Sequence, residues 1–275
     1  MPTFTGGPYR VARWAFAGAF LLVLLTAGCG GGALALDPVA SAADRTLDKQ
    51  TGRFAMTVTF DVPSVGRSTI SGEGSFSDRA MQMTMDFPDF GQGSPSSLEF
   101  RLLYPVMYMH FDGLPSGVQL LPDGKTWVKV DLQRSLKKLG VNLAKLGGGE
   151  SPTAALAQLR GSKDAKKLGT ETVDGVQTTH YRVKVNLDAA LARATPKQRQ
   201  AVQQLLRAAR EDGVDVTPTK VDVWIGDDGL VRRLTEKLGT VGTVTMTFSD
   251  YGAPVQIEAP PASETSDLST LLPYG

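Results

Sequence analysis

Apolar and polar residues alternate with a period of two along much of the chain, and this alternation predicts strands with one buried face. The first segments with this pattern are 54–62, 68–77 and 81–87, and the last of these alternates methionine with polar residues. Later segments are 99–111, 127–130, 170–173, 177–185, 219–225, 230–238 and 243–248. Asp174-Gly175, between two of these segments, is a strong signal for a β-hairpin.

Three stretches have helical spacing instead. In 37–50, Asp37 is placed to cap a helix that has Pro38 at its first position. A helical insert at about 131–160 carries a seam of leucines, and a second insert at about 187–211 begins a new turn at Thr195-Pro196. The leucine seam includes Leu136, Leu139 and Leu143, and the apolar face of the second insert includes Val202, Leu205 and Leu206.

This order of elements predicts one α+β domain over residues 37–262. Its core would be a curved antiparallel sheet with helices packed on the concave face. Residues 263–275 are polar and are expected to form a disordered tail.

The first 36 residues have a different character. Two arginines precede a short apolar run at 14–25, and small residues follow it directly before Cys29. This composition is typical of a secretory signal peptide over residues 1–28, and the run is too short to span a bilayer comfortably. The site resembles the lipobox of bacterial lipoproteins, although Thr26 stands where leucine is usual. The resemblance implies that Cys29 receives acyl chains such as palmitate and becomes the new N-terminus.

A glycine-rich tether over residues 29–36 would then link the domain to the membrane. Two acyl chains are sufficient for stable anchoring. The expected location is therefore the extracytoplasmic face of the cell membrane. The alternative is an ordinary signal peptide or membrane anchor in which the cysteine is incidental.

Composition removes several classes of function. The chain has 275 residues, 29 Lys+Arg against 28 Asp+Glu, and a formal net charge of +1, so a nucleic-acid partner is not expected. Cys29 is the single cysteine, which leaves no disulfide. Both histidines, His110 and His180, lie in predicted strands and are interpreted as structural. No catalytic motif, metal-ligand set or cofactor motif is evident, so we expect no enzyme activity and no cofactor.

Four segments resemble, in their order, the actinobacterial lipoproteins of the LppX/LprG type within the LolA-like superfamily. They are 125–132 (KTWVKVDL), 169–181 with its GTETVDGV start, 223–233 (VWIGDDGLVRR), and 250–260, which begins DYG and ends IEAP. The resemblance implies a half-barrel of antiparallel strands, with a hydrophobic cavity between the sheet and its helices. It also implies binding of an acylated lipid or glycolipid and its carriage across the envelope.

The apolar stripes of the sequence are compatible with such a cavity, because methionine and phenylalanine can repack around varied acyl chains. The candidate lining residues are Phe54, Met56, Val58, Phe60, Met83, Met85, Leu136, Leu139, Leu143, Val202, Leu205 and Leu206. The same side chains could equally form a closed core. In that case the chain would be a non-catalytic interaction or sensor lipoprotein, whose protein partner the sequence does not name. A hydrolase is the third and weakest alternative.

Overall fold

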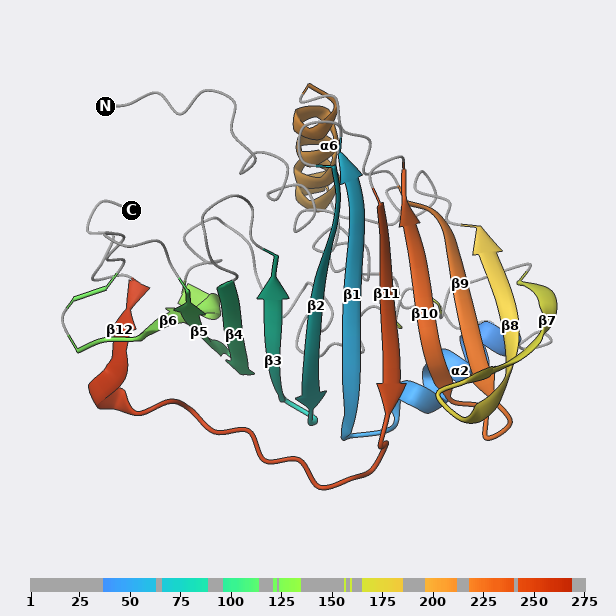
Figure 1. Ribbon diagram of the computed structural model, residues 1–275, viewed down its shortest axis with the longest axis horizontal. Helices are drawn as coiled ribbons and strands as arrows, with labels where there is room; N and C mark the ends of the chain where they lie inside the picture. Colours follow the sequence, from blue (N-terminus) through green and yellow to red (C-terminus); the bar gives the residue numbers. More distant parts are fainter. Residues whose placement is uncertain are drawn as a thin grey trace. The chain divides into compact units, whose positions relative to one another are not determined.

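The computed structural model describes residues 37–62, 66–88, 96–113, 121–122, 124–134, 156, 159, 165–184, 196–211, 218–239 and 242–268. In the described part of the chain, the helices with both ends placed are α2 (Pro38–Leu47) and α6 (Pro196–Glu211), with a short 3-10 helix η3 (Ala262–Glu264) near the end (Figure 1). The strands are β1 (Gly52–Val62), β2 (Gly66–Phe76), β3 (Ala80–Phe87), β4 (Ser96–Leu103), β5 (Val106–Asp112), β6 (Trp127–Asp131), β7 (Lys166–Val173), β8 (Val176–Lys184), β9 (Pro218–Gly226), β10 (Val231–Leu238), β11 (Gly242–Ser249) and β12 (Thr265–Asp267).

The twelve described strands form one sheet in the order β12-β6-β5-β4-β3-β2-β1-β11-β10-β9-β8-β7. Within the sheet, β3 pairs with β4 and β8 pairs with β9 as antiparallel ladders, whereas β12 pairs with β6 in parallel. The predicted α+β fold, built on an antiparallel sheet, is confirmed. Among the described residues, no helix has the length and apolar character needed to cross a membrane.

Contacts between residues divide the chain into two compact units, where the sequence predicted one domain. The first unit comprises residues 1–48, 56–69 and 153–247, and the second comprises 49–55, 70–152 and 248–275. Both contain a set of adjacent strands with alternating side chains.

In the first unit, α2 begins where the sequence predicted. The Oδ1 atom of Asp37 accepts hydrogen bonds from the backbone nitrogens of Val39 (2.9 Å) and Ala40 (3.3 Å), which is the expected N-cap. The helix ends at Leu47, three residues before the predicted end at 50. Its buried residues pack against β9 and β10.

The turn at Asp174-Gly175 confirms the predicted hairpin. Both residues have positive φ, 48° for Asp174 and 81° for Gly175, which is the backbone that a two-residue hairpin turn requires. β7 and β8 pair on either side of it. A second hairpin, between β9 and β10, turns through Gly229, whose φ of +76° also favours glycine.

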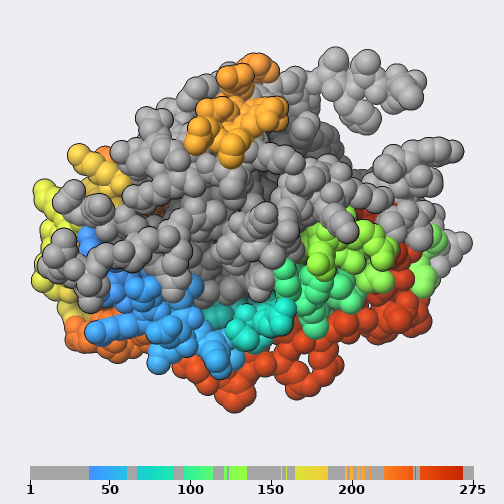
Figure 2. Space-filling model, turned by 180° about the vertical axis from the view of Figure 1, so that it is seen from behind, coloured from blue at the N-terminus to red at the C-terminus, as the bar shows by residue number. Residues whose placement is uncertain are grey.

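In the second unit, the predicted disordered tail is wrong for residues 263–268. Residues 265–267 form β12, which pairs with β6, and the backbone nitrogen of Thr126 donates to the carbonyl oxygen of Glu264 (2.9 Å). Figure 2 shows this C-terminal segment (red) beside the strands of the 96–134 region (green). A polar segment can complete a sheet edge because the ladder is made by backbone groups. Residues 257–261 have no regular structure.

Candidate functional site

The second unit has an apolar sheet face that is set by the register of its strands. In the ladder, Gly74 is opposite Met83, Met83 is opposite Phe100, Phe100 is opposite Met109, and Met109 is opposite Val128. Directly paired residues point to the same side of a sheet, and side chains two residues apart along a strand share that side. This row therefore identifies one continuous face across β2 to β6.

We call this surface the methionine face. Its members on β3 to β6 are Met81, Met83, Met85, Leu98, Phe100, Leu102, Met107, Met109, Phe111, Val128 and Val130. The opposite side of the same strands carries polar residues, for example Thr84, Glu99 and Arg101. On that side, Arg101 forms an ion pair with Glu99 (2.7 Å), and its guanidinium group lies over the Trp127 ring.

The methionine face is only partly buried. Met85, Leu102, Val128 and Val130 are buried, whereas Phe111 is 39% exposed. The intermediate members, each half-buried, are Met81, Met83, Leu98, Phe100, Met107 and Met109. Large apolar side chains that remain partly accessible across several strands are characteristic of a surface that contacts an apolar partner or ligand. The thioethers add flexibility that a rigid aliphatic core lacks.

Two phenylalanines extend this face by lying over glycines of neighbouring strands. A Cβ atom added to Gly74 would lie 2.6 Å from Cζ of Phe54, and one added to Gly52 would lie 2.7 Å from Cζ of Phe76. Each ring therefore occupies the space that a side chain on the glycine would take. Phe54 belongs to the same side of the sheet as Met83, because Gly74 is the partner of Met83.

The first unit has its own apolar side on β8 to β11. The register places Val183 opposite Val221, Val223 opposite Leu234, and Leu234 opposite Met246. We call this surface the valine face. Its buried members are Val183, Val221, Val223, Leu234, Val244 and Met246.

Glu236 interrupts the valine face. Its backbone partners are Val221 on β9 and Val244 on β11, so its side chain lies on the same side as theirs. The residue is 1% exposed, and its Oε2 atom has no hydrogen-bond partner in the described part of the chain. Burial raises the pKa of the Glu236 carboxyl to about 8, because removal from water disfavours the charged form.

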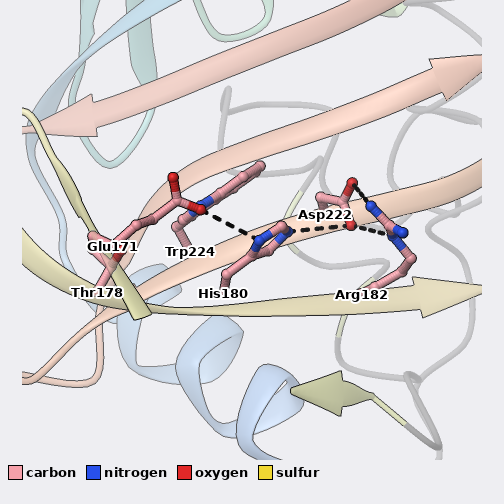
Figure 3. Close-up of polar contacts among 6 residues, drawn as sticks. All are labelled: Glu171, Thr178, His180, Arg182, Asp222 and Trp224. Atoms are coloured by element: carbon pink, nitrogen blue, oxygen red, sulfur yellow. Dashed lines mark hydrogen bonds and ion pairs between the residues drawn. The ribbon is translucent and has the colours of Figure 1, made fainter. Parts of the chain in front are cut away.

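The opposite side of the same strands carries a polar cluster (Figure 3). Nε1 of Trp224 donates to Oε1 of Glu171 (2.6 Å), and the Trp224 ring stacks on His180 with centroids 4.2 Å apart. Arg182 forms a two-pronged pair with Asp222, at 2.7 and 2.9 Å. Burial acts to raise the pKa of Asp222, but the hydrogen bond and charge of Arg182, aided by His180, hold it below its usual value.

This cluster explains His180 as a structural residue. Its Nδ1 lies 3.3 Å from Glu171 and its Nε2 lies 3.4 Å from Asp222, so the ring is held between two carboxylates and a tryptophan. In the second unit, Nδ1 of His110 lies 2.8 Å from the carbonyl oxygen of Thr126. Among the described residues, no group of three or more His, Cys, Asp or Glu side chains is arranged to hold a metal ion.

The structure describes the side chains of some predicted site residues and not of others. Phe54, Val58, Phe60, Met85 and Leu206 are buried, and Met56 and Met83 are half-buried. Cys29, Leu136, Leu139 and Leu143 lie outside the described residues, and Val202 and Leu205 lie in α6 without described side chains. A cavity lined by the full set stays a prediction.

The sequence analysis missed two features of these faces. Phe100 and Met109 were left out of the candidate lining, because the ladder that aligns them with Met83 depends on strand pairing that one sequence does not reveal. Glu236 was also missed. A signal for it was present, since it occupies the apolar phase of the alternation between Leu234 and Leu238.

Two Streptomyces proteins are similar to this chain in sequence. A Streptomyces griseus protein, described as an uncharacterized 31.2 kDa protein in the rplA–rplJ intergenic region, is 31% identical over 169 residues, which cover 55% of this chain and 51% of that protein. A Streptomyces coelicolor protein described as a putative lipoprotein is 28% identical over 155 residues, or 54% of this chain and 45% of that protein. The chain thus spans about half the length of these curated relatives. No family model matches it.

Several solved structures also align with the chain. LprF from Mycobacterium bovis aligns at 15% identity and a TM-score of 0.47, over 81% of this chain and 95% of that one. The Mycobacterium tuberculosis lipoprotein LppX aligns at 21% identity and a TM-score of 0.45, over 81% of this chain and 100% of that one.

Proposed function

We propose that this protein is a lipoprotein of the cell envelope that binds the acyl chains of a lipid and acts as its carrier without catalysing a reaction. Cys29, once acylated, would hold the chain on the extracytoplasmic face of the cell membrane. The acyl chains would lie along the methionine face. The ligand would be a lipid or glycolipid drawn from the membrane to which the protein is tethered.

The partly exposed methionine face carries this proposal. Phe100, Met83 and Met109 lie in one ladder row and are all half-buried, so the row offers apolar area that the chain itself does not fully cover. Burial of such area against an acyl chain is favourable by about 25 cal/mol per Å². Methionine side chains adapt to chains of different length and saturation.

Two further observations support the envelope location. The order of cationic, apolar and small residues before Cys29 is that of a lipoprotein signal, and the similar Streptomyces coelicolor protein is described as a putative lipoprotein. The even charge balance gives no reason to expect a nucleic acid or a strongly charged partner.

Native mass spectrometry of the full chain, extracted from its own host in a mild detergent, tests the proposal. We expect a non-covalent adduct of lipid mass that collisional activation releases. The covalent acyl chains on Cys29 would stay attached, so the two kinds of lipid are distinguishable. Absence of any releasable lipid would contradict the carrier function and favour the alternative of an interaction or sensor lipoprotein.

A matched pair of variants links the adduct to the methionine face. Met83→Lys places a charge on that face, whereas Thr84→Lys places it on the exposed opposite side of the same strand. We expect Met83→Lys to lose at least tenfold of the releasable lipid and Thr84→Lys to retain it. Equal thermal melting of the two variants is the control for folding. Equal lipid content in both would show that the ligand lies elsewhere.

A further inference from the structure

Four thioethers of the methionine face remain within reach of water-soluble reagents. They lie on β3 and β5 of the second unit, and each of their side chains is half-buried. Met85, on the same face, is buried, and so is Met246 in the first unit. Met56 in the first unit is half-buried as well. We call the four residues of the face the accessible methionines, and they are Met81, Met83, Met107 and Met109.

The strand register gathers the accessible methionines into one patch. Phe100 on β4 is opposite Met83 on one side and Met109 on the other, and the next row repeats this arrangement around Leu102. Neighbouring strands are about 5 Å apart, so two methionines that flank one β4 residue are about 10 Å apart at the backbone. A change of polarity at the four positions would therefore alter one continuous area of the face.

The thioether is the group of this face that an oxidant attacks. A peroxide transfers one oxygen atom to the sulfur, whose lone pair forms the new S–O bond as the O–O bond breaks. The methionine becomes a sulfoxide, and the other oxygen of the peroxide leaves as water with both protons. Cys29 is the single cysteine of the sequence and would be acylated, so no free thiol of this chain would compete for the oxidant.

A sulfoxide does not suit the apolar surroundings of these positions. Its oxygen accepts hydrogen bonds, whereas the side chains paired with the accessible methionines, which are those of Phe100, Leu102, Val128 and Val130, have no donor. An acyl chain placed over the sulfoxide would remove its water and supply no replacement. Because burial of an unsatisfied polar group is unfavourable, oxidation opposes the contact that the unmodified face favours.

We propose that the accessible methionines are a site of oxidation by peroxides, and that their sulfoxides prevent the methionine face from taking up an acyl lipid. The second part rests on the proposed lipid-binding function. A lipid already on the face would shield the thioethers, so the lipid-free protein is the form that responds. A methionine sulfoxide reductase restores the thioether, since two thiols reduce each sulfoxide and yield a disulfide and water.

Peptide mass mapping of the delipidated full chain, after graded exposure to hydrogen peroxide, tests the site. We expect the accessible methionines to gain oxygen about tenfold faster than the buried Met85 and Met246, which serve as controls within the same sample. Loading with lipid beforehand is expected to slow oxidation of the accessible methionines. Equal rates at all these positions, in protein that keeps its thermal melting, would overturn the assignment of the site.

Native mass spectrometry then measures uptake of lipid from vesicles made of the host's total lipid extract. We expect oxidised wild type to take up about tenfold less lipid than untreated wild type, because each buried sulfoxide is unfavourable. Incubation with methionine sulfoxide reductases and dithiothreitol is expected to restore the uptake.

A leucine variant and a matched control separate the face from the rest of the chain. Leucine nearly conserves the volume of methionine and forms no sulfoxide, so the uptake that this variant shows is expected to be the same before and after peroxide. Met246→Leu, outside the face, is the control and is expected to lose uptake on oxidation like the wild type. The leucine variant carries Met81→Leu, Met83→Leu, Met107→Leu and Met109→Leu.

The outcomes distinguish this inference from the proposed function. No uptake by the untreated wild type would contradict the carrier function, and the peptide map would still decide whether the site is oxidised selectively. Full uptake by wild type with oxidised accessible methionines, or an equal loss in the leucine variant, would overturn the effect on loading and leave lipid carriage intact. If the leucine variant takes up no lipid, restoration of the wild type by the reductases decides, since they reverse sulfoxides and no other damage.

Discussion

At the scale of single residues, Glu236 ties the stability of the fold to pH. Its pKa is about 8 in the folded protein, against an ordinary value of 4.5. Between these two pH values the carboxyl keeps its proton in the folded state and has lost it in the unfolded state. The contribution of the neutral carboxyl is complete below about pH 4.5 and is lost as the pH rises to 8. The cross-strand neighbours Val221 and Val244 carry no charge that would alter this direction.

We therefore expect the free energy of unfolding of the wild type to fall by about 1 kcal/mol per pH unit between pH 5 and 8 on account of this group. Glu236→Gln, which cannot ionise, removes that slope. Urea unfolding at several pH values measures it. Glu73→Gln, on an exposed side chain of β2, is the control and is expected to keep the wild-type slope. An unchanged slope in Glu236→Gln would contradict the assignment.

The same residue shows what sequence reasoning could and could not reach. The alternation from Leu230 to Leu238 predicted β10 correctly, because a half-buried strand repeats every second residue. The sequence also shows that a glutamate stands at a position where this alternation places buried side chains. Its lack of a partner was not, since that depends on Val221 and Val244, which come from two other strands.

At the scale of elements, close contact between β1 and β2 depends on glycine. Gly74→Ala would bring a Cβ atom against the Phe54 ring, at 2.6 Å, and against the backbone carbonyl of Gln82, which cannot move aside without disturbing the ladder. We expect a loss of about 1–3 kcal/mol in the free energy of unfolding, the usual cost of overpacking. Thermal and urea unfolding measure it.

Gly169→Ala in β7 is the matched control, because nothing lies within 4 Å of its Cβ position. Alanine there restricts the unfolded chain and meets no neighbour, so the effect is expected to be neutral or stabilising by up to about 1 kcal/mol. If both substitutions cost the same, the loss at Gly74 would reflect general strand propensity and not contact with Phe54.

The sequence predicts where several strands lie along the chain, but it does not predict which strands pair. The positions of β1, β3 and β11 followed from alternation, and the cap at Asp37 followed from local chemistry. β12 did not, because Thr265 to Asp267 are polar and form a strand only through backbone bonds to β6. Likewise, Phe100 joins Met83 on one face through register alone.

At the scale of the whole molecule, the methionine face has a proposed role only if the chain works beside a membrane, so the modification of Cys29 is central to the proposed function. The lipobox resemblance predicts acylation of the Cys29 thiol and removal of residues 1–28. Serine lacks the thiol, so Cys29→Ser is expected to incorporate no labelled palmitate and to retain residues 1–28. Because Cys29 is the single cysteine, no other thiol can take its place. Intact mass measurement of both proteins from the host membrane fraction gives the answer.

Thr26→Leu, which brings the site closer to the usual lipobox, is the control and should be processed and labelled like the wild type. If Cys29→Ser is cleaved at the same place as the wild type, the segment is an ordinary signal peptide with an incidental cysteine, and a carrier tethered through that residue is excluded.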